Sequence, residues 1–436
     1  MKNTKQISQR LFVRALGWRH QTTRTFARFL AAIVAFSTLF TLGAVESPAF
    51  SNITLERRLP AFAGRHVYRP YEDLSNNMAP LSPLPATEKE SFMRESQGFL
   101  VEELDGKIIE EQNTNTAYNP ASAVKVLTAY TTIKQFGPDF KFETKLLIDG
   151  STEGNSFEGD IYLEGRDPFF DTARLQEIFA EFKTRGINTV DASFFVSPDF
   201  KFAGQAPGQK SAKAVRNLFG AGRRKRARAL RTAGVRVTLK VAEVKIAPPG
   251  AELLKEIRSP TVLALLKDML SRSDNQMAAI FGQEVGGPQA VARVCRTDFG
   301  VSNESLSIAT TSGLGVNRVS PKAMIAALRG FKKLLAGYKL NLRDALPIAG
   351  IDQGTIFKRF EGSELKDVLV GKTGTLKQTD NGASVLVGEM STLLRGHILF
   401  VVFQRGRNTR QLRQSQNLFL EHVLSESGGP GSKYSG

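Results

Sequence analysis

Short apolar runs bounded by turn residues lie near both ends of the main body of the chain. Phe99–Val101 and Lys107–Ile109 flank an Asp-Gly pair, and this pattern predicts a β-hairpin. Similar runs return near the other end, at Val368–Gly371, Ser384–Gly388 and Ile398–Gln404. We therefore expect a sheet to which both ends of the chain contribute strands.

Apolar residues at helical spacing occupy much of the chain between these strands. A helix is predicted after Pro120, a residue suited to a first helical turn, and it stops at Gly137-Pro138. Helical order returns after Ser259, which we expect to cap the next helix. A last helix is predicted over Thr409–Val423.

The pattern changes to short strands over residues 149–247. Examples are Asp160–Leu163 and Ser193–Val196, and one helix is predicted over Asp171–Lys183. The order of elements predicts an α+β fold with an inserted, mainly β accessory domain. The surrounding domain, an antiparallel sheet from both chain ends plus a helical subdomain, would comprise residues 91–148 and 248–425.

The ends of the chain differ from its body. Seven basic residues and no acid precede or flank the apolar stretch Phe29–Val45, and Ser47-Pro48-Ala49 has the small-x-small pattern of a cleavage site. We expect residues 1–49 to be an export signal or, if uncleaved, an N-terminal anchor. The proline-rich residues 50–90 are predicted to be a linker, and the Gly/Ser-rich residues 426–436 a disordered tail.

Composition excludes several classes of protein. The 436 residues are 41% hydrophobic and 23% charged, which excludes collagen-like, coiled-coil and fully disordered chains. The net charge of +17 is concentrated in the leader and in residues 201–250, which hold thirteen basic residues and one acid. The rest of the chain is close to neutral, so we expect no nucleic-acid partner.

The densest basic run is Arg223–Arg231. We expect it to belong to an exposed arm over residues 210–231. The alternative is that this arm contacts anionic wall polymer or membrane headgroups.

Metal and disulfide chemistry have little support. Cys295 is the single cysteine and lies in an apolar helical run, so we expect an inert core residue. The four histidines are far apart, without metal-ligand spacing. We expect neither a metal nor a cofactor.

Ser122 and Lys125 are the first candidate reactive pair. Three-residue spacing on a helix brings a hydroxyl and an amine together, and an amine of lowered pKa can activate serine as a nucleophile. The spacing alone is weak evidence, because Ser363 and Lys366 share it and a solvated surface pair is the alternative.

Two further motifs follow the first in order. Ser273-Asp274-Asn275 follows a predicted helix, and Lys372-Thr373-Gly374 follows a predicted strand and occurs once in the chain. The set SxxK, SxN and KTG resembles the penicillin-recognising serine hydrolases. Finer matches are Tyr118–Ser122, Gly159–Gly165, Gly186-Ile187, Ser312–Leu314, Asn317–Pro321, Leu346–Gly350 and Gly354-Thr355. Over roughly residues 95–405 the chain resembles the D-alanyl-D-alanine carboxypeptidase/endopeptidase family of the penicillin-binding protein 4 type, peptidase family S13.

The resemblance implies a β-lactamase/transpeptidase-like fold and roles for the motif residues. Ser122 would be the acylated nucleophile and Lys125 its base. Ser273 would relay a proton to the leaving amine, and Asn275 would hold the substrate amide and orient Lys125. We expect the charge of Lys372 to lower the pKa of Lys125.

The third motif is implied to bind substrate. Lys372 and Thr373 would bind the terminal carboxylate, and Gly374 and Thr375 would line the same strand. The backbone amides of Ser122 and Thr375 would form the oxyanion hole.

Three departures from the family pattern concern substrate selection. Thr310-Thr311 stands where the family commonly has an acidic residue, and Arg166 stands where it has glycine. The segment Leu376–Asn381 is polar where the family has a short hydrophobic hairpin.

The expected function is therefore an exported, periplasmic or cell-envelope serine D,D-peptidase. Its partners would be peptidoglycan stem peptides, with β-lactams as covalent inhibitors, and its action carboxypeptidase, endopeptidase or both. The alternatives are a β-lactamase-like or esterase activity on the same fold, and a catalytically idle peptidoglycan-binding scaffold.

Overall fold

The structure is a computed structural model that describes residues 97–219 and 234–435. The predicted leader 1–49, the linker 50–90 and the basic run Arg223–Arg231 lie outside the described residues.

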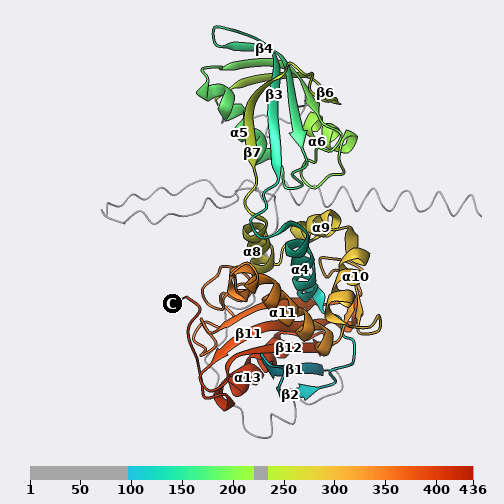
Figure 1. Cartoon of the computed structure of the whole chain (residues 1–436), viewed down its shortest axis with the longest axis vertical. Helices are drawn as coiled ribbons and strands as arrows, with labels where there is room; N and C mark the ends of the chain where they lie inside the picture. Colours follow the sequence, from blue (N-terminus) through green and yellow to red (C-terminus); the bar gives the residue numbers. More distant parts are fainter. Residues whose placement is uncertain (1–96, 220–233, 436) are drawn as a thin grey trace, which may run out of the picture. The chain divides into compact units, whose positions relative to one another are not determined.

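The first sheet joins both ends of the described chain, as predicted. Its five strands lie in the order β10-β11-β12-β1-β2, and all neighbours are antiparallel. Leu100 of β1 pairs with Val401 of β12, and Figure 1 shows the blue strand β1 beside the orange strand β12. The strands are β1 (Gln97–Glu103), β2 (Ile108–Gln112), β10 (Leu369–Leu376), β11 (Ala383–Thr392) and β12 (Gly396–Arg405).

The two faces of this sheet pack against different helices. Val385 and Val401 belong to the core that also contains residues of α4 (Val124–Phe136) and α11 (Pro321–Ala336). Their chain neighbours, such as Leu386 and Val402, pack with α13 (Thr409–Glu426). This alternation follows from the two-residue period of a strand.

Side-chain caps mark where several helices start. The α8 helix (Val262–Arg272) is capped by Thr261, whose side chain accepts from the Ala264 amide. The predicted cap, Ser259, instead accepts from the Phe142 amide. The remaining helices of this region are α9 (Asn275–Glu284), α10 (Gly287–Phe299) and α12 (Leu342–Ala345). Short 3-10 turns and strands complete it: η1 (Ala121–Ala123), η2 (Thr379–Asn381), β8 (Leu306–Ser307) and β9 (Arg318–Val319).

A second five-stranded sheet has its own hydrophobic core, formed by residues between Leu146 and Ile257. The strand order is β6-β5-β4-β3-β7, with β4–β5 and β5–β6 parallel. Its elements are β3 (Glu143–Glu153), β4 (Ser156–Gly165), α5 (Thr172–Thr184), β5 (Thr189–Val196), α6 (Gln209–Phe219), β6 (Arg236–Val244) and β7 (Glu252–Arg258). The sheet therefore begins before and ends after the predicted insertion 149–247.

The α6 helix corrects one prediction. We expected one helix in this region and an exposed arm over residues 210–231, but residues 209–219 are helical and bury Ala212 and Val215. The parallel pairing of β5 with β6 requires a crossover connection, and α6 lies within it. Intervening lysines and arginines obscured its narrow apolar stripe.

The predicted disordered tail over residues 426–436 is wrong. Its first residue ends α13, Pro430 forms a β-bridge with Thr392, and Tyr434 is 7% exposed. The Tyr434 amide donates to the Asp367 carbonyl at 2.8 Å. A single aromatic side chain anchors a segment whose composition otherwise resembles a flexible tail.

In the part of the chain that the structure describes, each helix is either too short or too polar to cross a bilayer.

Candidate active site

The first motif lies at a strained turn at the start of α4. Ser122 lies in η1, and the preceding Ala121 has φ of +46°, a backbone conformation that is costly for a residue other than glycine. The Asn119 side chain accepts from the Ala121 amide at 3.1 Å and so supports this turn. A Cβ on Gly313 would lie 2.1 Å from the Ala121 carbonyl oxygen, so only glycine allows this loop to approach the nucleophile.

Lys125 is fully buried beside Ser122, with its Nζ 3.0 Å from the Ser122 Oγ. The same Nζ donates to Asn275 Oδ1 at 2.7 Å and to the Ser312 carbonyl at 2.5 Å. Burial lowers the pKa of Lys125 to about 7, and the Asp274 carboxylate opposes this shift. Near neutral pH, a large fraction of this amine is therefore unprotonated.

The second motif lies between α8 and α9, as predicted. Ser273 ends α8 in the left-handed conformation, and the Asp274 side chain caps α9 by accepting from two backbone amides. This cap makes Asn275 the first residue of α9 and holds its side chain against Lys125. The turn thus delivers Ser273 and Asn275 to the same site.

The third motif lies within β10, at the edge of the first sheet. Lys372 is fully buried and donates to Ser273 Oγ at 2.9 Å and to the Thr373 carbonyl at 2.7 Å. Burial first, and the charge of Lys125 second, hold the pKa of Lys372 well below its usual range. We expected Lys372 to lower the pKa of Lys125; desolvation of Lys125 is instead the main cause.

The hydroxyls of the third motif also have partners. Thr373 Oγ1 lies 2.9 Å from Thr355 Oγ1, and Arg413 Nη2 donates to Thr375 Oγ1 at 3.0 Å. Gly374 allows close approach, because a Cβ there would lie 2.5 Å from the Pro120 carbonyl oxygen. All eight predicted site residues, Ser122, Lys125, Ser273, Asn275, Lys372, Thr373, Gly374 and Thr375, thus lie on segments that converge on one place.

Sequence reasoning missed four contributors to this site. Asp274 and Ser312 lie inside motifs that were noted, and Thr355 follows Gly354 in another. Arg413 lies on α13, far from every motif, and no sequence signal marked it.

A polar network connects three segments near the nucleophile. Asp380 accepts two hydrogen bonds from Arg318, at 2.5 and 3.0 Å, and one from Asn119 at 3.3 Å. Asn119 also donates to the Gly315 carbonyl at 3.0 Å. The polar segment Leu376–Asn381 therefore supplies a carboxylate that is hydrogen-bonded to both of the other segments.

Other candidates from the sequence lie outside this site. The Ser363 hydroxyl donates a hydrogen bond to the Glu421 carboxylate at 2.6 Å. The hydroxyl of this second SxxK copy is therefore paired with a carboxylate. Cys295 is buried, and burial raises the pKa of its thiol to about 12. Residues 97–219 and 234–435 contain no cluster of three or more metal-ligating side chains.

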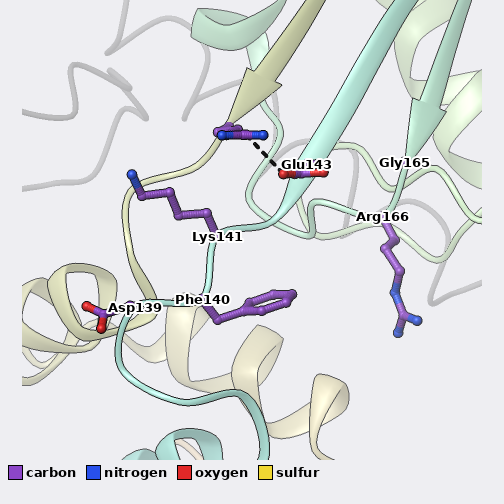
Figure 2. Close-up of a pocket in the computed structure, with 7 residues that line it drawn as sticks. Asp139, Phe140, Lys141, Glu143, Gly165 and Arg166 are labelled. Carbon is purple, nitrogen blue, oxygen red and sulfur yellow. Dashed lines mark ion pairs between the residues drawn. The ribbon is translucent and has the colours of Figure 1, made fainter. Parts of the chain in front are cut away.

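A separate open pocket of about 560 Å³ lies between residues 139–141, which precede β3, and the nearby ends of β3, β4 and β7. Figure 2 shows Phe140, Lys141 and Arg166 around it, with the ion pair between Glu143 and an unlabelled side chain as a dashed line. That partner is Arg258, at 2.9 Å. None of the eight predicted site residues lines this pocket.

Comparison with known proteins agrees with the motifs. A family model described as the D-Ala-D-Ala carboxypeptidase 3 (S13) family matches residues 85–205 and 201–422. The D-alanyl-D-alanine carboxypeptidase DacB of Haemophilus influenzae is 32% identical over 200 residues, which are 42% of this chain and 40% of that protein. The match thus spans less than half of this curated relative.

Solved structures show the same fold. A predatory endopeptidase from Bdellovibrio bacteriovorus has a TM-score of 0.64 and 21% identity, covering 77% of this chain and 94% of its own. Penicillin-binding protein 4 from Haemophilus influenzae, complexed with a β-lactam, has a TM-score of 0.59 and 21% identity, covering 78% and 99%. The predicted transpeptidase-like fold is confirmed.

Proposed function

Because the chain belongs to the D-Ala-D-Ala carboxypeptidase 3 (S13) family, we propose that it is a serine D,D-peptidase that acts on peptidoglycan stem peptides through an acyl-enzyme. The observation that carries this proposal is the placement of the Lys125 amine between Ser122 and two fixed acceptors. A neutral amine has two N–H bonds and one lone pair. Asn275 Oδ1 and the Ser312 carbonyl accept the two N–H bonds, which leaves the lone pair for the Ser122 hydroxyl.

Acylation then follows from this geometry. Lys125 takes the Ser122 proton as Oγ attacks the carbonyl carbon of the scissile bond. The backbone amides of Ser122 and Thr375 stabilise the resulting oxyanion, and loss of one such donor typically costs ~10²–10³ in rate. Ser273 passes its hydroxyl proton to the departing amine and takes one from the Lys372 ammonium, whose Nζ lies 2.9 Å from Ser273 Oγ. The ester left on Ser122 is later hydrolysed by water.

The substrate carboxylate completes the site. The hydroxyls of Thr373 and Thr375 can donate to this carboxylate, and Lys372 directly precedes Thr373 in β10. The lowered pKa of Lys372 means that the free site disfavours a second ammonium beside Lys125. A bound carboxylate would favour protonation of Lys372 and so connect substrate binding to the charge of the site.

Penicillin tests the proposal, because its lactam amide and carboxylate imitate a D-Ala-D-Ala terminus. One related structure is described as a penicillin G acylated endopeptidase. We expect mass spectrometry to find one adduct on the Ser122 peptide, lost in Ser122→Ala and retained in Ser363→Ala. Labelling that persists in Ser122→Ala would contradict the assignment.

Purified cross-linked peptidoglycan separates the possible activities. Loss of muropeptide dimers indicates endopeptidase action, and loss of terminal D-alanine from monomers indicates carboxypeptidase action. Rapid release of the penicillin adduct favours the β-lactamase-like alternative. Acylation without change in the muropeptides would favour the idle scaffold.

We also propose an envelope location, with residues 1–49 as leader or anchor and the basic run Arg223–Arg231 as a contact to anionic wall polymer or membrane. In the described part, Lys210 and Lys213 are exposed on α6, which precedes this run. Exposed charges are screened over ~8 Å at physiological salt, so binding to wall sacculi should weaken as salt is added. Unchanged sedimentation of a variant with glutamine at the six basic positions of 223–231 would contradict this contact.

The domain division remains a proposal as well. The second sheet and its separate core favour an accessory domain inserted into the catalytic domain. Limited proteolysis should release it as a stable fragment.

A further inference from the structure

We propose that Arg413 is a positioning residue for the substrate's terminal carboxylate, acting through the hydroxyl of Thr375. The inference rests on the proposed function and adds a residue of α13 to its binding site. Arg413 Nη2 lies 3.0 Å from Thr375 Oγ1.

Hydrogen-bond chemistry makes this contact directional. A guanidinium is a donor only, whereas a hydroxyl both donates and accepts. Because Thr375 Oγ1 accepts from Arg413, its own proton must point elsewhere. Thr375 is partly exposed at the edge strand β10, so that proton is available to a bound anion.

The strand places this hydroxyl beside a second one. Side chains two residues apart on a strand share a face, so Thr373 and Thr375 lie on the same side of β10, opposite Lys372. Leu369, on their side, packs in the core with α13, which carries Arg413. Two hydroxyls and one guanidinium thus meet on one side of the edge strand.

Charge around Arg413 also favours an anion. The half-buried Arg359 guanidinium donates to three neutral oxygens, those of the Asn417 and Gln416 side chains and the Arg413 carbonyl. Burial, and then the charge of Arg413, lower the pKa of Arg359 to about 9. A carboxylate bound beside Thr375 would offset the repulsion between these two guanidinium groups.

Arg413 supplies the permanent positive charge that Lys372 lacks in the free protein. The pKa of Lys372 lies well below its usual range, so in the free protein this amine is a poor permanent cation. A guanidinium stays charged throughout the working pH range. Arg413 would therefore attract the carboxylate before Lys372 gains a proton.

The test compares two forms of one peptide, ending in D-Ala-D-Ala with a free carboxylate or with a carboxamide. We expect Arg413→Gln to raise KM for the carboxylate form by about tenfold, because a charged hydrogen-bond partner is lost, with kcat within a few-fold. KM for the carboxamide should change less than twofold. Arg413→Lys, which keeps a charged donor, should recover part of the loss.

A double variant tests the route through Thr375. In a Thr375→Val background, Arg413→Gln should add little further loss, because the hydroxyl that it orients is gone. The matched control is Arg410→Gln, one turn earlier on α13 and exposed, which should leave both peptides unaffected.

The outcomes separate this inference from the proposed function. Equal losses on both peptides, or full additivity with Thr375→Val, overturn the role of Arg413 while penicillin still acylates Ser122. Absence of that acylation in the unmodified protein overturns the proposed function itself. If Arg413→Gln unfolds, Arg413→Lys provides the same comparison of carboxylate with carboxamide.

Discussion

The Lys125 amine is buried and shares its site with a second amine, so its protonation should set the pH dependence of the reaction. Only the neutral form can accept the Ser122 proton. With a pKa of about 7, penicillin acylation should therefore rise with pH and reach half its maximum near pH 7. The measurement is the acylation rate constant across pH.

Asp274 offers a variant that moves this midpoint. Its carboxylate raises the pKa of Lys125, so Asp274→Asn should shift the acylation midpoint to lower pH, while asparagine can still cap α9. Asp298→Asn is the control, because Asp298 pairs instead with Lys134 and Tyr130. An upward shift in Asp274→Asn would contradict the electrostatic role.

At the same scale, sequence reasoning located the motif residues but not what surrounds them. The spacing of Ser122 and Lys125 on one helical turn is a local property, so it could be predicted. The Ser312 carbonyl and the Arg413 guanidinium come from segments far along the chain, and their approach depends on tertiary packing. For the same reason, desolvation of Lys125 could not be weighed against the charge of Lys372.

Among the elements, α9 depends on contacts from the segment around β4 and β5. The Phe169 ring packs against Phe281 with centroids 4.8 Å apart, and Lys201 pairs with the nearly buried Glu284. Both partners lie on α9, whose first residue is Asn275. These contacts therefore support α9, whose first residue, Asn275, accepts a hydrogen bond from Lys125.

Phe169→Ala tests this support. Loss of a largely buried phenylalanine typically costs about 3–5 kcal/mol, and we expect the free energy of unfolding in urea to fall by a similar amount. Acylation by penicillin should slow even where the variant is fully folded. Phe195→Ala removes a ring that stacks on Tyr162, and it should slow acylation much less. Equal effects of the two variants would show that α9 needs no such support.

Element prediction succeeded where the apolar pattern was long and failed where it was sparse. The strands and the helix after Pro120 were predicted from dense apolar runs. The α6 helix was missed because its buried residues Ala212 and Val215 are few and lie among Lys210, Lys213 and Arg216. The ordered tail was missed because Tyr434 is its single large apolar residue.

For the whole molecule, the tail ties the described C-terminal end to the first sheet. The Tyr434 hydroxyl donates to Glu389 at 2.8 Å, and Lys332 and His397 pair with the same buried carboxylate. Burial alone would raise the pKa of Glu389, but these partners together hold it below its usual value. The carboxylate contributes stability above its unfolded-state pKa, and this contribution is lost as pH falls through the folded-state value.

Tyr434→Phe should lower the free energy of unfolding at pH 7 by about 1–3 kcal/mol, because Glu389 loses a donor while the ring remains. The difference from the unmodified protein should shrink as pH falls through the lowered folded-state pKa of Glu389, where the carboxylate gains a proton. Urea unfolding at several pH values measures both effects. Tyr338→Phe, at an exposed tyrosine, is the control, and a loss that is independent of pH would contradict the role of the carboxylate.

The pairing of β1 with β12 also constrains the order in which a growing chain can fold. Gln97 pairs with Gln404, so β1, the first strand of the described residues, can form its hairpin with β2 early but must wait for β12, the last described strand, before its other edge is paired. The second sheet uses one continuous stretch, residues 143–258, and can close while later residues are still being synthesised. Until β12 is made, the apolar face of β1 needs protection from aggregation. The active site likewise cannot assemble before the first sheet is complete.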